Sequence, residues 1–204
     1  MKGLIIGATG ATGKDLLAKL LEDEAFSEIH SFVRKPMSIS HPKLHAHVVD
    51  FDTPEAWADL LYGDVAFSCL GTTLAVAGSK DAQWRVDYDY QYAFAEHCKN
   101  NGVPTFVLVS AAGAKAQSKL FYNHMKGALE EAVKKLNFPR LLIFQPSVLI
   151  RSNSDRSGEN FTVKAFKFLN KLGILKRYRP MPTEILAEKM LSAVYNSPKG
   201  TFTF

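Results

Sequence analysis

The stretch Gly7-Ala-Thr-Gly-Ala-Thr-Gly13 decides the fold of this chain. It follows the apolar run Leu4-Ile5-Ile6, which is typical of a buried strand, and it leads into residues 14–21, which have a helical pattern. Glycines allow a sharp turn and bring backbone N–H groups close to a ligand, and the helix N-terminus favours anions. A strand, a glycine-rich turn and a helix together predict a phosphate-binding loop, the place of the pyrophosphate in dinucleotide-binding folds.

Apolar strand-like runs alternate with helical patterns along the chain, which predicts a parallel sheet with helices on both faces. We expect strands at residues 4–6, 29–33, 45–50, 65–69, 106–110 and 141–144. We expect helices to start near Thr12, Pro54, Asp81 and Lys119, a last helix over residues 184–196, and an edge strand over residues 201–204. The predicted fold class is therefore α/β, a doubly wound parallel sheet of the Rossmann type.

The chain is predicted to form one domain over residues 1–204, because no linker or repeat divides it. Residues 151–182 depart from the β/α rhythm. They follow the sixth strand, on the side where open α/β sheets bind ligands. We expect this stretch to be a small segment that covers the substrate.

Composition excludes several classes of protein. The 204 residues are 47% apolar and 22% charged, as in ordinary soluble domains, and no apolar run is long enough to cross a bilayer. The first strand begins within a few residues of Met1, which leaves no room for a signal or transit peptide. Cys69 and Cys98 lie far apart and are expected to be reduced thiols. These features predict a cytoplasmic protein with no membrane partner.

The formal net charge of +5 includes basic residues within the stretch 164–179. A basic surface can attract nucleic acid, but no nucleic-acid-binding motif accompanies the charge. The spacing of Lys164, Lys167 and Lys171 favours a solvated helix face. We therefore expect no nucleic-acid partner, and the sequence leaves the oligomeric state open.

A second motif, Tyr122-Asn-His-Met-Lys126, points to chemistry. Tyr122 and Lys126 share one face of the predicted helix, because they are four residues apart. A nearby ammonium favours the ionised form of a tyrosine and brings its pKa from about 10 towards working pH, which makes a usable general acid or base. Ser110 lies at the end of the fifth strand. Because such pairs also occur by chance on amphipathic helices, the glycine turn and Ser110 are needed to favour catalysis.

Together, Gly7-Ala-Thr-Gly-Ala-Thr-Gly13, Ser110 and Tyr122-x-x-x-Lys126 resemble the short-chain dehydrogenase/reductase superfamily. More narrowly, the chain resembles its small atypical members related to the Tat-interacting-protein oxidoreductases. Further matching stretches are Phe67-Ser-Cys-Leu-Gly-Thr-Thr73, Val86-Asp-Tyr-Asp-Tyr90 and Phe144-Gln-Pro-Ser-Val-Leu149. The resemblance extends from the first strand to about residue 175.

The resemblance implies a catalytic role for three residues. Tyr122 would exchange a proton with the substrate oxygen, and Ser110 would hydrogen-bond that oxygen. Lys126 would hold the nicotinamide ribose and lower the pKa of Tyr122. Many members of the superfamily carry an asparagine on the helix after the fourth strand, whereas the matching residue here is Asp87.

The end of the second strand indicates which nicotinamide cofactor binds. An acid there would bind the ribose of NAD, whereas an arginine accommodates the extra phosphate of NADP. The chain has Arg34 and Lys35 and no acid, so NADP(H) is favoured over NAD(H). The full set of expected cofactor-binding residues is Gly7, Thr9, Gly10, Ala11, Thr12, Gly13, Arg34, Lys35, Asp50, Phe51, Leu70, Gly71, Thr72, Tyr122, Lys126, Pro146 and Val148.

The remaining candidates concern a metal and the overall function. His41, His45 and His47 form a local histidine cluster, but a metal site needs a further ligand that the nearby sequence does not supply, so no metal is expected. The predicted function is oxidation or reduction of a small carbonyl/alcohol substrate with NADP(H). The alternative is a catalytically weak NADP(H)-binding regulatory or scaffold protein that works through protein partners. A sugar-nucleotide epimerase would need a larger C-terminal lobe than this chain offers.

Overall fold

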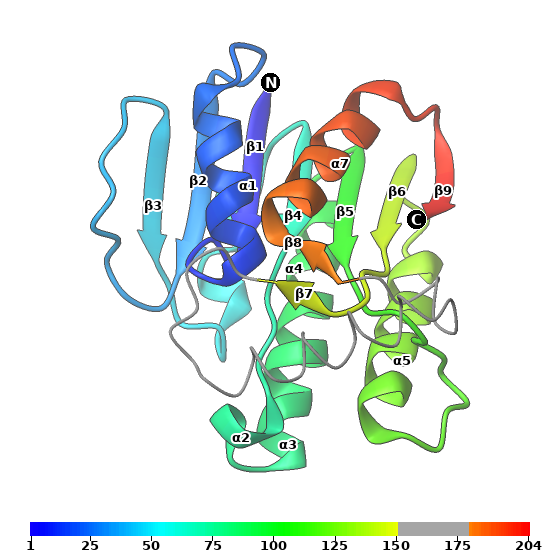
Figure 1. Ribbon diagram of the computed structural model, residues 1–204. Helices are drawn as coiled ribbons and strands as arrows, with labels where there is room; N and C mark the ends of the chain where they lie inside the picture. The colour runs from blue at the N-terminus through cyan, green and yellow to red at the C-terminus, as the bar shows by residue number, and fades with distance from the viewer. Residues whose placement is uncertain (151–179) are drawn as a thin grey trace.

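The computed structural model describes residues 1–150 and 180–204, which fold around one parallel sheet (Figure 1). The strand order is β3-β2-β1-β4-β5-β6-β9, and every neighbouring pair runs parallel. The strands are β1 (Lys2–Ile6), β2 (Glu28–Val33), β3 (Leu44–Val48), β4 (Val65–Ser68), β5 (Thr105–Val109), β6 (Arg140–Phe144) and β9 (Gly200–Thr203). This order confirms the predicted doubly wound Rossmann-type fold.

Helices connect these strands. They are α1 (Ala11–Glu22), α2 (Leu74–Ala77), α3 (Lys80–Trp84), α4 (Tyr90–Asn100), α5 (Phe121–Lys135) and α7 (Thr183–Asn196). A π-helical stretch, Arg85–Asp89, joins α3 to α4. The helix predicted from Asp81 is therefore interrupted by a wider turn, and the helix predicted from Lys119 begins at Phe121.

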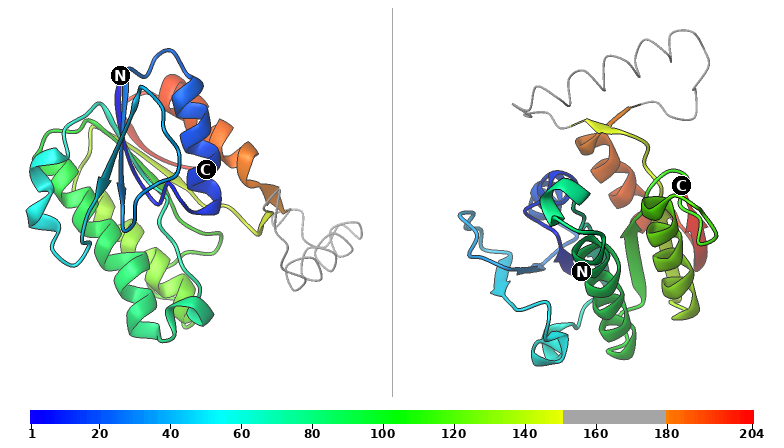
Figure 2. Two further views of the ribbon diagram at one scale, coloured as in Figure 1. Left: turned by 90° about the vertical axis from the view of Figure 1, so that its left-hand side faces the viewer. Right: turned by 90° about the horizontal axis from the view of Figure 1, so that it is seen from below.

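The helices cover both faces of the sheet, as the edge-on view of Figure 2 shows. On one face, Leu16 and Leu20 of α1 share a core with Met190 of α7. On the other face, Phe94 of α4 shares a core with Leu129 of α5. Each such side chain is fully buried and contributes about 1.5–3 kcal/mol by leaving water. The sheet is thus held from both sides, which fixes the carboxyl ends of its strands.

The helix expected from Pro54 is wrong. The segment forms two single 3₁₀ turns, Pro54–Ala56 and Ala58–Leu60. The buried Trp57 lies between them, and its indole N–H donates to the carbonyl oxygen of Asp50 at 2.9 Å, which turns the chain back towards the end of β3. The connection between β3 and β4 therefore has no full helix.

The predicted edge strand is confirmed as β9, which pairs with β6. A two-stranded sheet of β7 (Leu149–Ile150) and β8 (Met181–Pro182) was not predicted. Most of the expected substrate-covering segment, residues 151–179, lies outside the described residues. Among the helices that the structure does describe, none is long and apolar enough to span a membrane.

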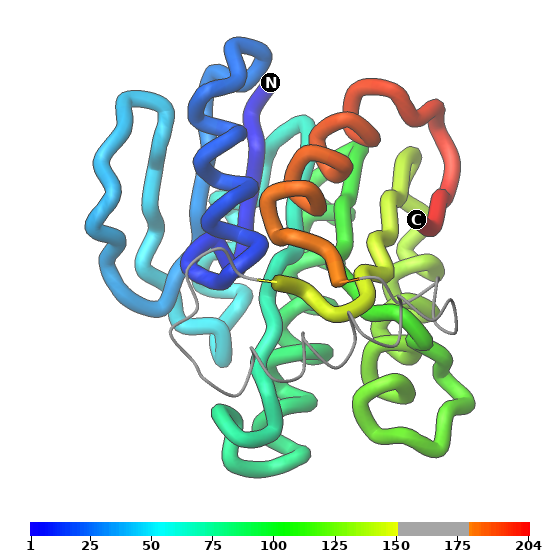
Figure 3. The backbone as a smooth tube through the Cα atoms, in the orientation of Figure 1, coloured from blue at the N-terminus to red at the C-terminus, as the bar shows by residue number. Residues whose placement is uncertain are grey.

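The strand order changes direction at β1, whose neighbours are β2 and β4. The chain runs from β1 through α1 to β2, and it later returns to the other side of β1 as β4, as the trace in Figure 3 shows. Connections that leave in opposite directions open a crevice at the carboxyl ends of β1 and β4. The glycine-rich turn follows β1 at that crevice.

Candidate functional site

The glycine-rich turn has no room for a side chain at Gly7 or at Gly13. Gly7 has a φ of +79°, and a Cβ there would lie 2.4 Å from the carbonyl carbon of Cys69. A Cβ on Gly13 would lie 2.1 Å from the carbonyl oxygen of Gly7. The N–H of Gly10 donates to that oxygen at 2.9 Å and closes the turn before α1. The turn therefore packs its own backbone against the end of β4.

A cavity of about 660 Å³ opens over this turn. Eight of the predicted cofactor-binding residues line it: Gly7, Thr9, Gly10, Arg34, Phe51, Leu70, Gly71 and Thr72. The sequence analysis did not assign the other lining residues to the cofactor; they are Cys69, Val76, Ala77, Asp81, Ala82, Arg85, Val86 and Tyr90. Most of these belong to α2, α3 and the π-helical stretch, which form one wall. Their apolar pattern resembles ordinary helix packing, so no signal in the sequence distinguished them.

The other predicted cofactor residues lie outside this lining. Ala11, Thr12 and Gly13 form the first turn of α1, and the last two are buried. Lys35 is exposed, and the Asp50 carboxylate accepts from the N–H of Asp52 at 2.9 Å within the turn after β3. Tyr122, Lys126, Pro146 and Val148 come from the region of α5 and β6. Their contact with a cofactor stays a prediction.

Two arginines line the cavity, Arg34 after β2 and Arg85 at the start of the π-helical stretch. The Arg85 guanidinium lies 3.7 Å from the carboxylate of Asp52, and the pair is largely exposed. The Tyr90 hydroxyl donates to the same carboxylate at 2.8 Å, and burial together with that carboxylate raises the pKa of Tyr90 to about 12. The cavity is therefore lined by a second cation, Arg85, which the sequence analysis did not predict.

Lys126 is buried against a carboxylate. Its ammonium lies 2.9 Å from Oδ1 of Asp87, and both side chains are almost wholly buried. The other oxygen of Asp87 accepts from the N–H of Thr72 at 2.8 Å, and the carbonyl oxygen of Asp87 accepts from Gln91 at 2.9 Å. Asp87 lies in the π-helical stretch, a type of turn frequent at functional sites. The departure from asparagine thus creates an ion pair between the cavity wall and α5.

Tyr122 lies one turn before Lys126 on α5, and 41% of the residue is exposed. Its pKa is raised, first because the surrounding protein keeps water from the hydroxyl. The Lys126 ammonium lowers this pKa, as the sequence predicted, but the Asp87 carboxylate acts against it. Lys126 thus acts in the predicted direction, but burial and Asp87 outweigh it, and the pKa of Tyr122 stays above its ordinary value.

Ser110 is buried beside a second carboxylate. Its hydroxyl donates to Oε1 of Glu130, and the amide of Gln145 donates to both oxygens of Glu130 at 2.9 and 3.0 Å. A serine hydroxyl has one proton to donate. In this arrangement that proton is used by Glu130, so Ser110 must turn before it can donate to another oxygen.

The sequence reasoning missed Glu130, although a signal was present. Tyr122, Lys126 and Glu130 are spaced by four residues each, which places them along one face of a helix. Gly127 allows that helix to approach the loop after β5, since a Cβ there would lie 2.2 Å from the carbonyl carbon of Lys115. The structure thus brings Lys126 to Asp87 and Ser110 to Glu130.

Comparison with known proteins identifies relatives of this chain. A family described as NAD(P)H-binding matches residues 7–138. The mitochondrial protein FMP52-1 of Scheffersomyces stipitis is 33% identical over 198 residues, covering 95% of this chain and 84% of that protein. Protein HTATIP2 of Rattus norvegicus is 38% identical over 167 residues, covering 79% of this chain and 69% of that protein.

Solved structures show the same fold at low sequence identity. A UDP-glucose 4-epimerase of Thermotoga maritima, solved with UDP-glucose, aligns with a TM-score of 0.75 at 13% identity. The alignment covers 100% of this chain and 76% of that chain. MoeE5, solved with UDP-glucuronic acid and NAD, aligns with a TM-score of 0.73 at 13% identity, covering 100% of this chain and 75% of that chain.

The relatives also overturn one prediction. The sequence predicted a cytoplasmic protein, but FMP52-1 of Scheffersomyces stipitis and FMP52 of Saccharomyces cerevisiae are named as mitochondrial proteins. The cytoplasmic prediction rested on composition and on the position of the first strand. Neither property determines localisation, because a targeting signal is a short segment that a receptor recognises.

Proposed function

This chain belongs to the NAD(P)H-binding family, as an atypical protein of the short-chain dehydrogenase/reductase type, and from that premise we propose that it is an NADP(H)-dependent oxidoreductase of a small carbonyl/alcohol substrate. The observation that carries the proposal is the cavity over the Gly7–Gly13 turn. Its base has no room for a Cβ, and Arg34 lies on its wall. Such a base suits a pyrophosphate, and a guanidinium suits a further phosphate.

A nicotinamide dinucleotide fits these residues. Gly7 and Gly10 would lie against the pyrophosphate, Phe51 would pack on the adenosine, and Arg34 would pair with the phosphate that distinguishes NADP from NAD. When bound, the cofactor supplies or accepts a hydride. Arg85 adds a second positive charge to the same cavity.

The chemistry of the chain itself is a proton transfer at Tyr122. Because the pKa of Tyr122 is raised, its hydroxyl is protonated at neutral pH and can donate to a carbonyl oxygen that gains charge. Lys126 supplies positive charge beside it, and Asp87 holds the ammonium in place. Ser110 would turn from Glu130 and donate to the same oxygen.

The first experiment is calorimetric titration of the full chain with NADPH and, separately, with NADH. We expect NADPH to bind more tightly than NADH. We expect Arg34→Ala to weaken the binding of NADPH and to leave the binding of NADH unchanged. Loss of a charge-assisted pair costs about 1.5–3 kcal/mol, or roughly a tenfold to hundredfold change in affinity. Equal losses for the two nucleotides would remove Arg34 from the proposal, and the absence of binding by either would overturn it.

A second experiment tests the chemistry. Tyr122→Phe should bind NADPH as the unchanged chain does but lose turnover of any aldehyde or ketone that the chain reduces, by about a hundredfold to ten-thousandfold. Unchanged turnover would remove Tyr122 from the mechanism.

One observation favours the alternative of a catalytically weak NADP(H)-binding regulatory or scaffold protein. Lys126 and Ser110 are both engaged by buried carboxylates rather than free to meet a substrate. NADPH binding without turnover of any compound in a broad panel of carbonyl substrates would support that alternative.

A further inference from the structure

A histidine-rich cluster lies on the neighbouring strands β2 and β3, with Glu28, His30 and His45 in the amino-terminal halves of these strands. Glu28 and His30 are two residues apart and lie on one face of β2. His45 and His47 are likewise two residues apart and lie on the same face of β3. His30 pairs in register with His45. The cofactor cavity is at the other ends of the strands, since it includes Arg34 after β2. The cluster is therefore separate from the site described above.

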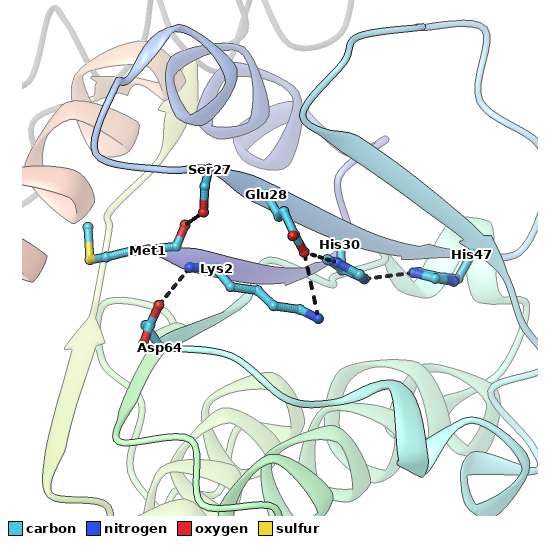
Figure 4. A network of polar contacts seen from close by, with 7 residues as sticks. All are labelled: Met1, Lys2, Ser27, Glu28, His30, His47 and Asp64. Carbon is cyan, nitrogen blue, oxygen red and sulfur yellow. Dashed lines mark hydrogen bonds and ion pairs between the residues drawn. The ribbon is translucent and has the colours of Figure 1, made fainter.

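The ring of His30 is at the centre of this cluster. Its Nε2 lies 3.1 Å from Oε2 of Glu28, and its Nδ1 lies 2.9 Å from Nε2 of His47, as Figure 4 shows. The His45 ring stacks on His30 with their centroids 4.8 Å apart. One ligand atom from each of Glu28, His30 and His45 lies within 4.8 Å of the other two. Three donor groups thus converge from two strands.

The cluster is also accessible to a solute. Glu28 and His45 are exposed, and His30 is half-buried. The connection between β3 and β4 consists of two single 3₁₀ turns, so no full helix from it covers this end of the strands. Exposed side chains on an edge strand can change rotamer at small cost.

We propose that Glu28, His30 and His45 form a binding site for a divalent transition-metal ion of the zinc class. Imidazole and carboxylate donors suit Zn²⁺, whereas Ca²⁺ and Mg²⁺ prefer oxygen donors alone. Ligand bonds of about 2.0–2.1 Å in a tetrahedral site hold neighbouring donor atoms roughly 3.3 Å apart. The Glu28 and His30 donors are already at 3.1 Å, and rotation of the exposed His45 ring brings in the third. Water completes the coordination.

His47 has a different role in this site. With the metal on Nε2 of His30, the proton of that ring is on Nδ1, which donates to Nε2 of His47. That hydrogen bond fixes the orientation of the His30 ring. His47 is therefore a positioning residue and not a ligand.

Lys2 opposes metal binding. Its ammonium lies 3.9 Å from Oε2 of Glu28, as Figure 4 also shows, and must move aside when a cation binds there. Removing that ammonium should strengthen metal binding. The substitution Lys2→Met leaves the backbone N–H of Lys2, which donates to Asp64 at 2.7 Å, unchanged. Tighter binding is a result that general damage to the fold would not produce.

The experiment is a calorimetric titration of the metal-free full chain, without a histidine tag, with ZnCl₂ at pH 7.5. We expect one equivalent to bind. Positioning partners contribute about tenfold to a hundredfold to metal affinity, so His47→Phe should weaken binding within that range, and Glu28→Gln and His45→Asn by at least as much. Lys2→Met should bind more tightly. The control His97→Gln, on α4, should bind as the unchanged chain does.

Three results would overturn the proposal: no zinc binding by the unchanged chain, unaltered affinity in both Glu28→Gln and His45→Asn, or an equal loss in His97→Gln. Circular dichroism of each variant confirms that it is folded. Glu28 and His45 are exposed, so their substitution should leave the fold intact. NADPH titration of the same variants separates this site from the cofactor cavity, because their affinity for NADPH should not change.

Discussion

At the carboxyl ends of β1 and β4 the candidate site consists mainly of backbone, whereas along α5 it consists of charged side chains. The Gly7–Gly13 turn depends on the absence of a side chain at its two ends, where a Cβ would lie within 2.4 Å of backbone atoms. Along α5, Lys126 and Glu130 work because specific partners are present, Asp87 for one and Ser110 for the other. The two regions should therefore fail in different ways when they are altered.

The difference matters for what each region can do. A backbone cradle is already in place and needs no rearrangement to receive an anion. The charged region is held by interactions that compete with a substrate, because Lys126 and Ser110 are already paired. We infer that cofactor binding depends on shape, whereas turnover depends on how readily these pairs exchange partners.

The largest effect is expected from Lys126→Met, which leaves the Asp87 carboxylate buried without its cation. Removing one partner of a buried ion pair costs about 3–5 kcal/mol of the free energy of unfolding. Urea denaturation followed by circular dichroism measures this loss. The matched control is Lys134→Met, also on α5, whose side chain is 43% exposed and whose ammonium lies 3.8 Å from the buried Glu130 carboxylate. Because the Lys134 side chain is solvated and Glu130 keeps its other partners, the loss of this ammonium should cost less than about 1 kcal/mol. Equal losses in the two variants would mean that the buried pair does not hold α5 to the cavity wall.

A smaller effect with a decisive sign is expected from Gly13→Ala. Helix propensity alone predicts that alanine stabilises α1 by about 1 kcal/mol relative to glycine. The Cβ would instead lie 2.1 Å from the carbonyl oxygen of Gly7, so the backbone must shift, which costs about 1–3 kcal/mol. We expect net destabilisation in urea and weaker NADPH binding.

The matched control for the cradle is Gly71→Ala. Gly71 lines the same cavity, but a Cβ there would lie 3.6 Å from Oδ1 of Asp87, which is an ordinary contact. The free energy of unfolding of the Gly71→Ala variant should stay within about 0.5 kcal/mol of that of the unchanged chain. Stabilisation by Gly13→Ala would show that the turn can relax and that the cradle is not rigid.

This contrast also explains what the sequence could predict. The glycine turn and the positions of the strands follow from local patterns, because a glycine spacing and an apolar run are visible in a single stretch. The partners Asp87 and Glu130 could not be assigned in the same way, because each pairing depends on the three-dimensional placement of separate elements. The π-helical stretch that carries Asp87 has no local signature in the sequence.

The wrong prediction at Pro54 has the same origin. The sequence pattern predicts a helix start there, but Trp57 donates to Asp50 and turns the segment back, a contact that no periodicity shows. The donors of the proposed metal site show the same limit of the sequence. Glu28 and His30 lie far from His45 along the chain and come beside it only once β2 and β3 pair.

The smallest effect is a change in the pKa of Tyr122, which reports the balance of charge in the region along α5. The Asp87 carboxylate raises this pKa and the Lys126 ammonium lowers it. In Asp87→Asn the carboxylate that raises this pKa is lost, and the ammonium that lowers it remains. The pKa of Tyr122 should therefore fall. The hydroxyl would then ionise at lower pH, and the alkaline limit of any proton donation by Tyr122 should move down with it. Carbon-13 NMR of tyrosine-labelled protein measures the titration, with the resonance assigned by its absence in Tyr122→Phe.

Asp89→Asn is the matched control, because Asp89 lies in the same π-helical stretch and raises the pKa of Tyr88 instead. That substitution should lower the pKa of Tyr88 and leave that of Tyr122 unchanged. An equal fall at Tyr122 in both variants would assign the effect to the net charge of the stretch rather than to the Asp87–Lys126 pair. An unchanged pKa in Asp87→Asn would mean that exclusion of water alone sets the acidity of Tyr122. The charged region would then resemble the cradle, with its properties set by shape.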